Sequence, residues 1–303
     1  MSHARAGSAE SSLNLGGPPS IQLIQIRDLV YRVAGMFQPD SKLRLLESRC
    51  WKRMQAMGVA TLQDYYRWLS VYPANQTELV ALLNEITVGE TFFFRNQPQL
   101  DALHNIVLPR IVAARAKMSA RHLRIWSAGS STGEEPYTLS MMLLEELTGQ
   151  LTGWTFEILA TDLNQISIAH AEQGLYGEYS TRNLPEHFRQ KYFDSCGESL
   201  QIDAELKSHV KFSRVNLLDD SKMVFMKDFD VIFCCNVLIY FHGAAKGRVV
   251  QHFYDNLLPH GYLFLGHSES LYGVNEDFRL VHLPSATAYV KSEKRPLASL
   301  VQV

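Results

Sequence analysis

The hydrophobic periodicity of this chain changes once, near Arg121, and that change constrains the fold more than any other feature of the sequence. From Ile21 to about Lys117, apolar residues recur at the three- and four-residue spacing of amphipathic helices. From Arg121 onward, short β-rich runs such as LRIWS, FEILAT, FDVIFCC and GYLFLG alternate with helical stretches. This alternation is typical of a parallel sheet with helices on both faces. The sequence therefore predicts a small helical domain followed by an α/β domain.

Two segments depart from the alternation. The runs FRLVHL and ATAYVK are separated only by Pro284 and Ser285, which is too short for a crossover helix, so the last strand is expected to be antiparallel. The stretch between Gly174 and Arg214 is longer than one crossover helix needs, and we interpret it as a small inserted subdomain that can hold a hairpin.

Composition and the two ends of the chain indicate the class of protein. A chain of 303 residues corresponds to about two domains, and 46% hydrophobic with 20% charged residues is ordinary for globular proteins. Residues 1–20 are rich in Ser, Gly, Ala and Pro and are expected to be a disordered leader, and residues 292–303 a flexible tail. We find no apolar run typical of a signal peptide or a membrane span, so a cytoplasmic protein is expected.

Charge and cysteine content argue against several partners. A formal net charge of -2 gives no overall basic field of the kind that nucleic-acid binding uses. The four cysteines include no CxxC pair and no histidines at metal-ligand spacing. We therefore expect no disulfide scaffold, no metal site and no nucleic-acid partner.

The strongest local signal is the string IWSAGSSTGEEPY, residues 125–137. A strand runs into a loop from Gly129 to Gly133, and Pro136 lies in the first turn of the helix that follows. Small residues let a ligand approach the backbone N–H groups at such a helix start. Glu134 and Glu135 would repel a phosphate, so a ligand with hydroxyls or a positive charge fits better. The alternative is a tight strand-to-helix turn without a ligand.

Two further strand ends carry polar side chains. The next strand ends in Asp162, where a carboxylate can bind a ribose diol, and this favours a nucleoside-containing ligand. Asn236 interrupts the apolar run FDVIFCCNVLIYF, where it either orients a ligand or caps a turn, and Tyr240 follows on the loop. Cys234 and Cys235 are interpreted as core strand residues.

The segment ITVGETFFFR, residues 86–95, links the two halves of the chain. Three consecutive phenylalanines can hardly all face one core, and Arg95 directly after them is a candidate anion clamp. Considered alone, the segment is better explained as interdomain packing with a surface arginine.

Taken together, these motifs resemble the CheR family of chemoreceptor glutamate methyltransferases, which use S-adenosylmethionine. The order of the motifs and the long string that begins at Trp126 are highly specific, and the match spans about Ile21 to Lys291. The matching segments are Thr91 to Arg95, Trp126 to Tyr137, Ala160 to Asp162, Asn216 to Leu218, Phe233 to Phe241 and Gly266 to Glu269.

Two positions depart from the family pattern. Gly89 stands where members often carry Asn, which removes one contact to the cofactor. Cys235 stands where members often carry Arg, which removes a charge near the acceptor or the sheet edge. Neither departure removes a group that methyl transfer requires.

The resemblance implies a fold and its boundaries. The expected fold is a class I S-adenosylmethionine-dependent methyltransferase sheet, mainly parallel with an antiparallel last strand, preceded by a small all-α N-terminal domain. The expected segments are a helical domain at residues 21–88, a linker with a helix at 89–118, and the methyltransferase domain at 119–291, with a small β-subdomain at about 185–210. The turn from Asp194 to Ser199 looks short for gripping a receptor tether peptide, which favours a tether-independent enzyme.

The resemblance also implies roles for individual residues, with S-adenosylmethionine as cofactor and no metal. Asp162 would hold the ribose, Glu134 or Glu135 would lie near the amino-acid portion, and Tyr240 near the methyl group. Arg95 and Tyr240 are the expected catalytic residues, and whether Arg95 pairs with the cofactor or the acceptor stays open. The expected cofactor-binding residues are Thr91, Arg95, Gly129, Gly133, Glu134, Glu135, Asp162, Asn216, Leu217, Cys235 and Asn236. Because a glutamate carboxylate is ionised at neutral pH, the reaction needs no general base.

A basic stretch is the expected site for the chemoreceptor. Arg49, Lys52 and Arg53 fall at i, i+3 and i+4 on one face of a predicted helix, whose buried stripe is Leu43, Leu46, Cys50, Met54 and Met57. A solvated helix face explains the same charges. The resemblance favours binding of a glutamate-rich receptor helix.

Other functions stay open at this point. The chain is also compatible with a methyltransferase of another substrate, a nucleotide-binding oxidoreductase, or a non-catalytic nucleotide-binding module. An NAD site predicts G-x-G-x-x-G, and the loop here lacks the middle glycine.

Overall fold

A computed structural model describes residues 18–71, 74–87, 89–115, 121–284 and 286–291. The expected leader at residues 1–20 lies almost wholly outside the described residues, and the expected tail at 292–303 lies outside them entirely. Among the residues described, no helix is long and apolar enough to cross a membrane.

The predicted helical N-terminal domain is confirmed. Its α2 helix buries Leu43, Leu46, Cys50 and Met54 along one stripe, while Met57 is only partly buried. The helix ends at Gly58, whose φ of 69° is in the left-handed region that favours glycine. The main helices of this domain are α1 (Ile21–Ala34), α2 (Leu43–Met57), α3 (Leu62–Ser70) and α4 (Gln76–Ile86).

The second domain is built on a seven-stranded sheet of order β6-β2-β1-β7-β8-β10-β9. The β10 strand is antiparallel to both of its neighbours, and the other pairs are parallel, so the predicted sheet with an antiparallel last strand is confirmed. Its strands are β1 (His122–Ala128), β2 (Thr155–Asp162), β6 (Val210–Arg214), β7 (Phe229–Cys234), β8 (Leu257–Leu265), β9 (Phe278–His282) and β10 (Thr287–Lys291).

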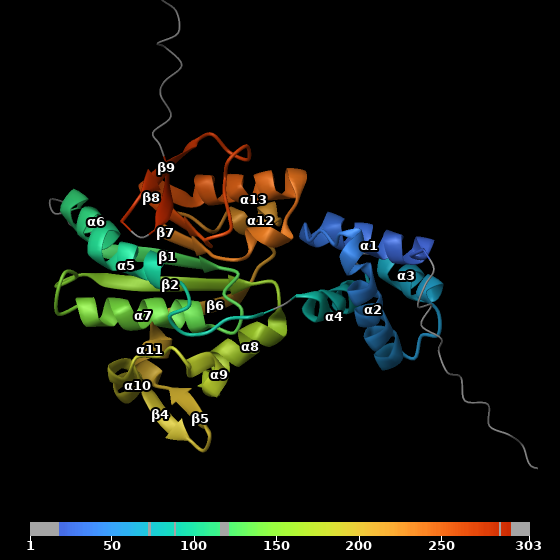
Figure 1. The fold of residues 1–303 in the computed structure, drawn as a ribbon, viewed down its shortest axis with the longest axis horizontal. Coiled ribbons are helices and arrows are strands. Elements are labelled where there is room, and N and C mark those ends of the chain that lie inside the picture. The colour runs from blue at the N-terminus through green and yellow to red at the C-terminus, as the bar shows by residue number, and fades with distance from the viewer. Residues whose placement is uncertain (1–17, 72–73, 88, 116–120, 285, 292–303) are drawn as a thin grey trace, which may run out of the picture.

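Helices cover both faces of this sheet, as Figure 1 shows. One core lies between the sheet and the helices that precede and follow β1, and the other lies under the helices around β7. The first group comprises α5 (Gln97–Ala102), a π-helical turn (Leu103–Val107), α6 (Leu108–Ala114) and α7 (Glu134–Glu146), together with α11 (Ala204–Ser208). The second comprises α12 (Asp220–Met223) and α13 (Gly243–Asn256). The α8 helix (Gln165–Gln173) lies against β2 and β6.

The predicted β-subdomain is also present, and its strands begin earlier than expected. A three-stranded antiparallel sheet of order β3-β5-β4 starts at Leu175 rather than near residue 185. Its elements are β3 (Leu175–Tyr176), α9 (Glu178–Thr181), α10 (Glu186–Tyr192), β4 (Phe193–Cys196) and β5 (Ser199–Ile202).

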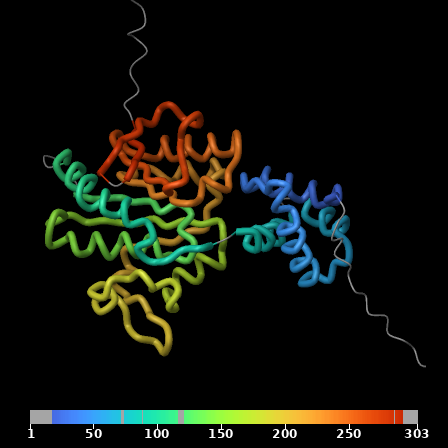
Figure 2. Tube along the Cα trace, in the orientation of Figure 1, coloured from blue at the N-terminus to red at the C-terminus, as the bar shows by residue number. Residues whose placement is uncertain are grey.

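The helical domain lies to one side of the α/β domain, as the trace in Figure 2 shows. Its α1 helix and the segment after it contact the loop that follows β7. Met36 forms a β-bridge with Phe241, and the amide of Asn216 donates to the carbonyl of Val33 at 2.7 Å. The two domains therefore meet beside the ends of the strands that carry the candidate site.

Candidate active site

A cleft of about 270 Å³ opens at the carboxyl ends of β1, β2 and β7. The linker before α5 closes one side of it, and the short helical turn η3 (Leu238–Tyr240) covers another. Of the residues that the sequence analysis selected, Thr91, Arg95, Gly129, Glu135, Asp162, Asn216, Leu217, Cys235, Asn236 and Tyr240 line the cleft. Gly133 and Glu134 are not among its lining residues.

The two glycines of the β1–α7 loop are explained by packing. Gly129 has a φ of 81°, and a Cβ at this position would clash with the side chain of Val237. Gly133 has a φ of 97°, and a Cβ there would lie 2.8 Å from that of Ala171 and 2.9 Å from the hydroxyl oxygen of Tyr176. The structure thus gives Gly133 a role in fitting α7 against α8 and β3 rather than in contact with a ligand.

Ser130, between these glycines, is the residue whose polar atom most directly indicates a ligand. Its side chain lines the cleft and is 2% exposed, and its Oγ has no hydrogen-bond partner in the described structure. A buried hydroxyl without a partner costs free energy unless a bound molecule supplies one. A polar ligand such as S-adenosylmethionine, with hydroxyl, amino and carboxylate groups, fits this lining.

Asp162 ends β2 and is held by the loops on either side of it. Its Oδ1 accepts from the N–H of Asn164 and its Oδ2 from the N–H of Ser131, both at 2.8 Å. Burial raises the pKa of this carboxyl, and the backbone N–H groups oppose that rise. Each carboxylate oxygen has a further lone pair, so the group can also accept two hydroxyl donors of a ribose diol.

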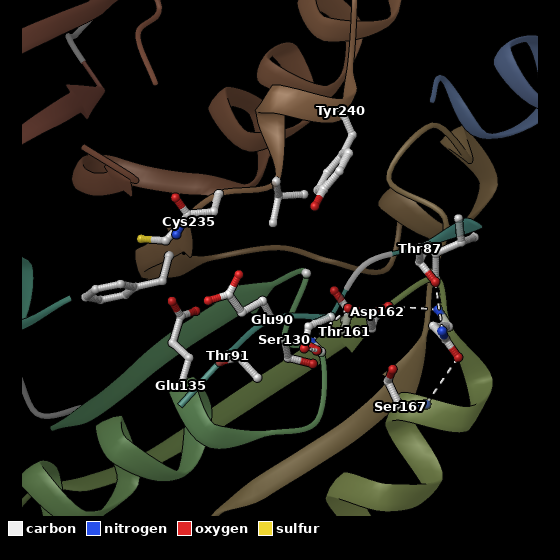
Figure 3. Close-up of a pocket in the computed structure, with 18 of the residues that line it drawn as sticks. Thr87, Glu90, Thr91, Ser130, Glu135, Thr161, Asp162, Ser167, Cys235 and Tyr240 are labelled. Carbon is white, nitrogen blue, oxygen red and sulfur yellow. Dashed lines mark hydrogen bonds between the residues drawn. The ribbon is translucent and has the colours of Figure 1, made fainter. Parts of the chain in front are cut away.

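The neighbouring residues Glu134 and Glu135 point in different directions. Glu134 is buried away from the cleft and accepts from the hydroxyls of Thr132 at 2.7 Å and Ser180 at 2.8 Å. Glu135 faces the cleft and accepts from the Ser127 hydroxyl at 2.8 Å (Figure 3). The sequence did not decide which of these two carboxylates faces the ligand. The structure shows that Glu135 is the one available to it.

Burial raises the pKa of Glu135 from 4.5 to about 7. Hydrogen bonds from Ser127 and Cys235 and the charge of Arg95 lower it in part, and the nearby carboxylate of Glu269 raises it. Because the pKa of Glu135 is close to neutral pH, a bound positive charge would lower that pKa and favour the ionised carboxylate. Glu135 is therefore suited to bind a cationic group.

The linker closes the cleft with Thr91 and Arg95. The Arg95 guanidinium donates to the carbonyl of Glu90 and lies 5.7 Å from the ring centroid of Phe92. The three phenylalanines separate as the sequence suggested, because Phe93 and Phe94 are buried in the core and Phe92 is only partly buried. The linker is therefore an anchored wall of the site.

The loops after β6 and β7 form the opposite wall. Asn216 uses its amide to hold the helical domain and accepts from the N–H of Leu218 at 3.1 Å, so part of its role is structural. Cys234 is completely buried in β7, as predicted, whereas Cys235 lies beyond the strand and lines the cleft. Burial raises the pKa of the Cys235 thiol well above its ordinary value, so the thiol is neutral.

Tyr240 lies at the end of η3 and points its hydroxyl into the cleft from the side opposite Ser130 and Asp162 (Figure 3). Burial raises the pKa of this hydroxyl, and the charge of Arg95 opposes the rise. A neutral phenol in this position can donate a hydrogen bond to an acceptor oxygen.

Glu269 ends the motif from Gly266 to Glu269, for which the sequence alone predicted no role. Its Oε2 accepts from the N–H groups of Asn236 at 2.7 Å and Gly266 at 2.8 Å, and its Oε1 from that of Ile239 at 3.1 Å. Asn236 has a φ of 62°, and a Cβ at Gly266 would come within 2.9 Å of the Asn236 backbone nitrogen. One carboxylate thus shapes the loop that carries Asn236 and Tyr240. In the sequence, the motif GHSE at residues 266–269 was the feature that could have pointed to Glu269.

The basic stretch on α2 is largely engaged within the helical domain. Arg53 makes a bidentate pair with buried Glu78, at 3.0 and 2.7 Å, and Lys52 pairs with Glu85 at 2.8 Å. Arg49 is only partly exposed. None of the three lines the cleft. No cluster of His, Cys, Asp and Glu that could hold a metal was found within the part of the chain that the structure describes.

Comparison with known proteins identifies relatives along nearly the whole chain. Residues 21–87 match the family model described as the CheR methyltransferase all-alpha domain, and residues 89–287 match the CheR methyltransferase SAM binding domain. Chemotaxis protein methyltransferase 2 of Vibrio cholerae is 35% identical over 271 residues, which cover 89% of this chain and 92% of that protein. The chemotaxis protein methyltransferase of Borreliella burgdorferi is 34% identical, with 83% and 89% covered, and that of Salmonella typhimurium is 34% identical, with 84% and 86% covered.

Proposed function

The chain belongs to the CheR methyltransferase family, and from this membership we propose that it esterifies glutamate side chains of chemoreceptors in chemotactic signalling. It is an S-adenosylmethionine-dependent methyltransferase. The observation that carries the proposal is the arrangement of the cleft, with Asp162 and Glu135 both lining it and the partnerless hydroxyl of Ser130 within its wall.

We propose that the cofactor lies along the ends of β1, β2 and β7. Asp162 accepts the ribose hydroxyls, and Asn216 and Leu217 line the adenine and ribose side. Glu135 attracts the cationic amino group. Asn236 also lines the adenine and ribose side, Cys235 forms part of the cleft wall, and the linker residues Thr91 and Arg95 close over the site.

Bound S-adenosylmethionine supplies the methyl group: a glutamate oxygen bonds to the methyl carbon as the carbon–sulfur bond breaks, which leaves a methyl ester and S-adenosylhomocysteine. The acceptor is already a carboxylate at neutral pH, so no residue of the chain has to remove a proton. The protein contributes by orienting the acceptor and by excluding water from it.

Tyr240 and Arg95 are the residues we assign to this orientation. The Tyr240 hydroxyl points into the cleft and can donate to the acceptor carboxylate. Arg95 carries a positive charge at the same cleft, where it can pair with the carboxylate of either the acceptor or the cofactor.

The partner in this proposal is the cytoplasmic helical region of a chemoreceptor, which places the enzyme in the cytoplasm. We keep Arg49, Lys52 and Arg53 as candidates for attracting that acidic region. The charge of Arg53 is largely compensated by Glu78, so its share of the attraction should be smaller. We retain residues 21–88, 89–118 and 119–291 as the proposed domain boundaries.

Two assays test this function. Calorimetric titration with S-adenosylhomocysteine should give binding, and titration with NADH should give none. Incubation with methyl-labelled S-adenosylmethionine and a chemoreceptor cytoplasmic fragment should label the fragment. Binding of NADH, or labelling of a nucleic acid or small molecule instead of the receptor, would overturn the proposal.

A further inference from the structure

A second hollow of about 180 Å³ adjoins the active-site cleft on its outer side. It lies where the segment between α1 and α2 meets the start of α2 and the η3 turn. Ile239, Tyr240 and Phe241 line both the cleft and this hollow. A molecule that occupies the hollow is therefore placed next to the η3 turn that carries Tyr240.

The walls of the hollow expose large apolar side chains. Phe37 is 39% exposed, Leu45 44% and Ile239 55%, and all three line it. Grouped exposed apolar side chains beside a functional cleft are typical of a binding surface, whereas isolated ones need no explanation. We call this surface the Phe37–Leu45–Ile239 groove.

The groove is joined to the active-site loop by two hydrogen bonds to backbone carbonyls and by one ring contact. The N–H of Phe37 donates to the carbonyl of Tyr240, and the Tyr31 hydroxyl donates to the carbonyl of His242, each at 3.0 Å. The Phe37 ring stacks on that of His242 with 5.1 Å between centroids. The Phe37 wall of the groove is thus in direct contact with the segment from Tyr240 to His242.

The charge at the groove suits an acidic occupant. Lys42, at the start of α2, lines the hollow and is exposed. At the other end of α2, Lys52 and Arg53 are paired with Glu85 and Glu78 of α4. Among the residues that line the hollow, Lys42 is the one whose positive charge can attract an acidic side chain.

We propose that the Phe37–Leu45–Ile239 groove docks the receptor helix that carries the methyl-accepting glutamate. This inference rests on the proposed function and names where its substrate binds. Apolar side chains of an amphipathic helix lie against Phe37, Leu45 and Ile239, as in other helix-in-groove complexes. An acidic side chain of the same helix is attracted by Lys42, and the acceptor glutamate enters the cleft past Tyr240.

The test compares two leucine variants with equal exposure. Leu45→Asp puts a negative charge in the groove, whereas Leu280→Asp makes the same change on β9 at a leucine that is also 44% exposed. With a chemoreceptor cytoplasmic fragment as substrate, Leu45→Asp should lower kcat/KM at least tenfold, mainly by raising KM, and Leu280→Asp should not. Affinity for S-adenosylhomocysteine should be unchanged in both variants.

A second variant and a binding assay make the outcomes distinguishable. Lys42→Glu should also raise KM, with the same thermal unfolding midpoint as the wild type. If the wild type methylates the fragment and Leu45→Asp matches Leu280→Asp, the docking proposal is wrong although the function holds. If the wild type binds the fragment, loses that binding in Leu45→Asp, and transfers no methyl group, the docking proposal holds and the proposed function is wrong.

Discussion

The Oε2 atom of Glu269 accepts a hydrogen bond from the backbone N–H of Asn236 at 2.7 Å. This contact ties the loop after β8 to the loop after β7, which lines the cleft. A carboxylate that accepts three backbone N–H groups is a strong local constraint, because charge-assisted hydrogen bonds are about twice as strong as neutral ones.

Glu269→Gln should therefore weaken both the fold and the site. An amide offers one acceptor oxygen and turns its NH₂ group towards N–H donors. We expect the free energy of unfolding to fall by about 2 kcal/mol and the affinity for S-adenosylhomocysteine to fall about tenfold. Urea unfolding and calorimetry measure the two effects. Glu276→Gln, at an exposed position nearby, is the control, and equal behaviour of the two variants would remove Glu269 from the site.

Asp162→Asn should weaken cofactor binding and also lower the free energy of unfolding, because the amide NH₂ group faces one of the two backbone N–H donors that the Asp162 carboxylate accepts from. Asn keeps the size of the side chain and one acceptor oxygen but removes the charge that receives the ribose hydroxyls. Hydrogen bonds to charged groups contribute about 1.5 to 3 kcal/mol, so the dissociation constant of S-adenosylhomocysteine should rise roughly ten- to 150-fold. Asp255→Asn, at an exposed position on α13, should leave it unchanged. Wild-type affinity in Asp162→Asn would contradict the assignment.

Cofactor binding should depend on pH through Glu135. Its pKa of about 7 in the ligand-free protein means that it is mostly protonated below pH 7, where it cannot attract the amino group of S-adenosylhomocysteine. The affinity for S-adenosylhomocysteine should be constant above about pH 8. Below pH 7 it should fall with each pH unit, and the loss should approach about tenfold per unit. Glu135→Gln should bind weakly and lack this dependence. An unchanged pH profile in that variant would show that another group titrates.

The raised pKa of Glu135 also predicts that the stability of the protein decreases with rising pH, whereas the cofactor affinity increases. Because the folded-state pKa is raised from 4.5 to about 7, the folded protein binds more protons than the unfolded chain in this window. The free energy of unfolding should therefore fall as pH rises from about 4.5 to 7. Unfolding in urea at several pH values should show this fall in the wild type and a smaller one in Glu135→Gln.

Arg53→Ala should destabilise the helical domain. Its guanidinium pairs with buried Glu78, which also accepts from the Tyr65 hydroxyl at 2.8 Å, so the variant leaves a buried carboxylate without its cation. We expect a loss of about 2 kcal/mol in unfolding free energy. Lys52→Ala, at an exposed lysine of the same helix, should change stability by less than about 0.5 kcal/mol. Equal stability of the two variants would show that the Arg53 pair is not structural.

The sequence predicted those site residues that lie at the ends of strands. Asp162 and Asn236 line the same cleft because the carboxyl ends of parallel strands lie at one edge of a sheet, and this follows from the alternation of strands and helices. The antiparallel last strand follows from a connection too short for a helix.

Other features depend on contacts between distant segments. Glu134 and Glu135 are adjacent, and the choice between them is decided by packing of α7 against Ser180, which the sequence does not show. Glu269 accepts hydrogen bonds from backbone N–H groups, and the sequence does not show which N–H groups a carboxylate will reach. The pairing of Arg53 depends on how α2 packs against α4. In each case the direction of a side chain is set by its contacts with a distant segment, so the sequence alone could not predict it.

The most direct test of the account is to locate the transferred methyl group. The wild-type protein is incubated with S-adenosylmethionine that carries a labelled methyl group and with a chemoreceptor cytoplasmic fragment, which is then digested and analysed by mass spectrometry. We predict a methyl ester on specific glutamates, which mild base cleaves with release of methanol, together with formation of S-adenosylhomocysteine. A base-stable methyl group on another residue type, or no transfer to the receptor, would contradict it.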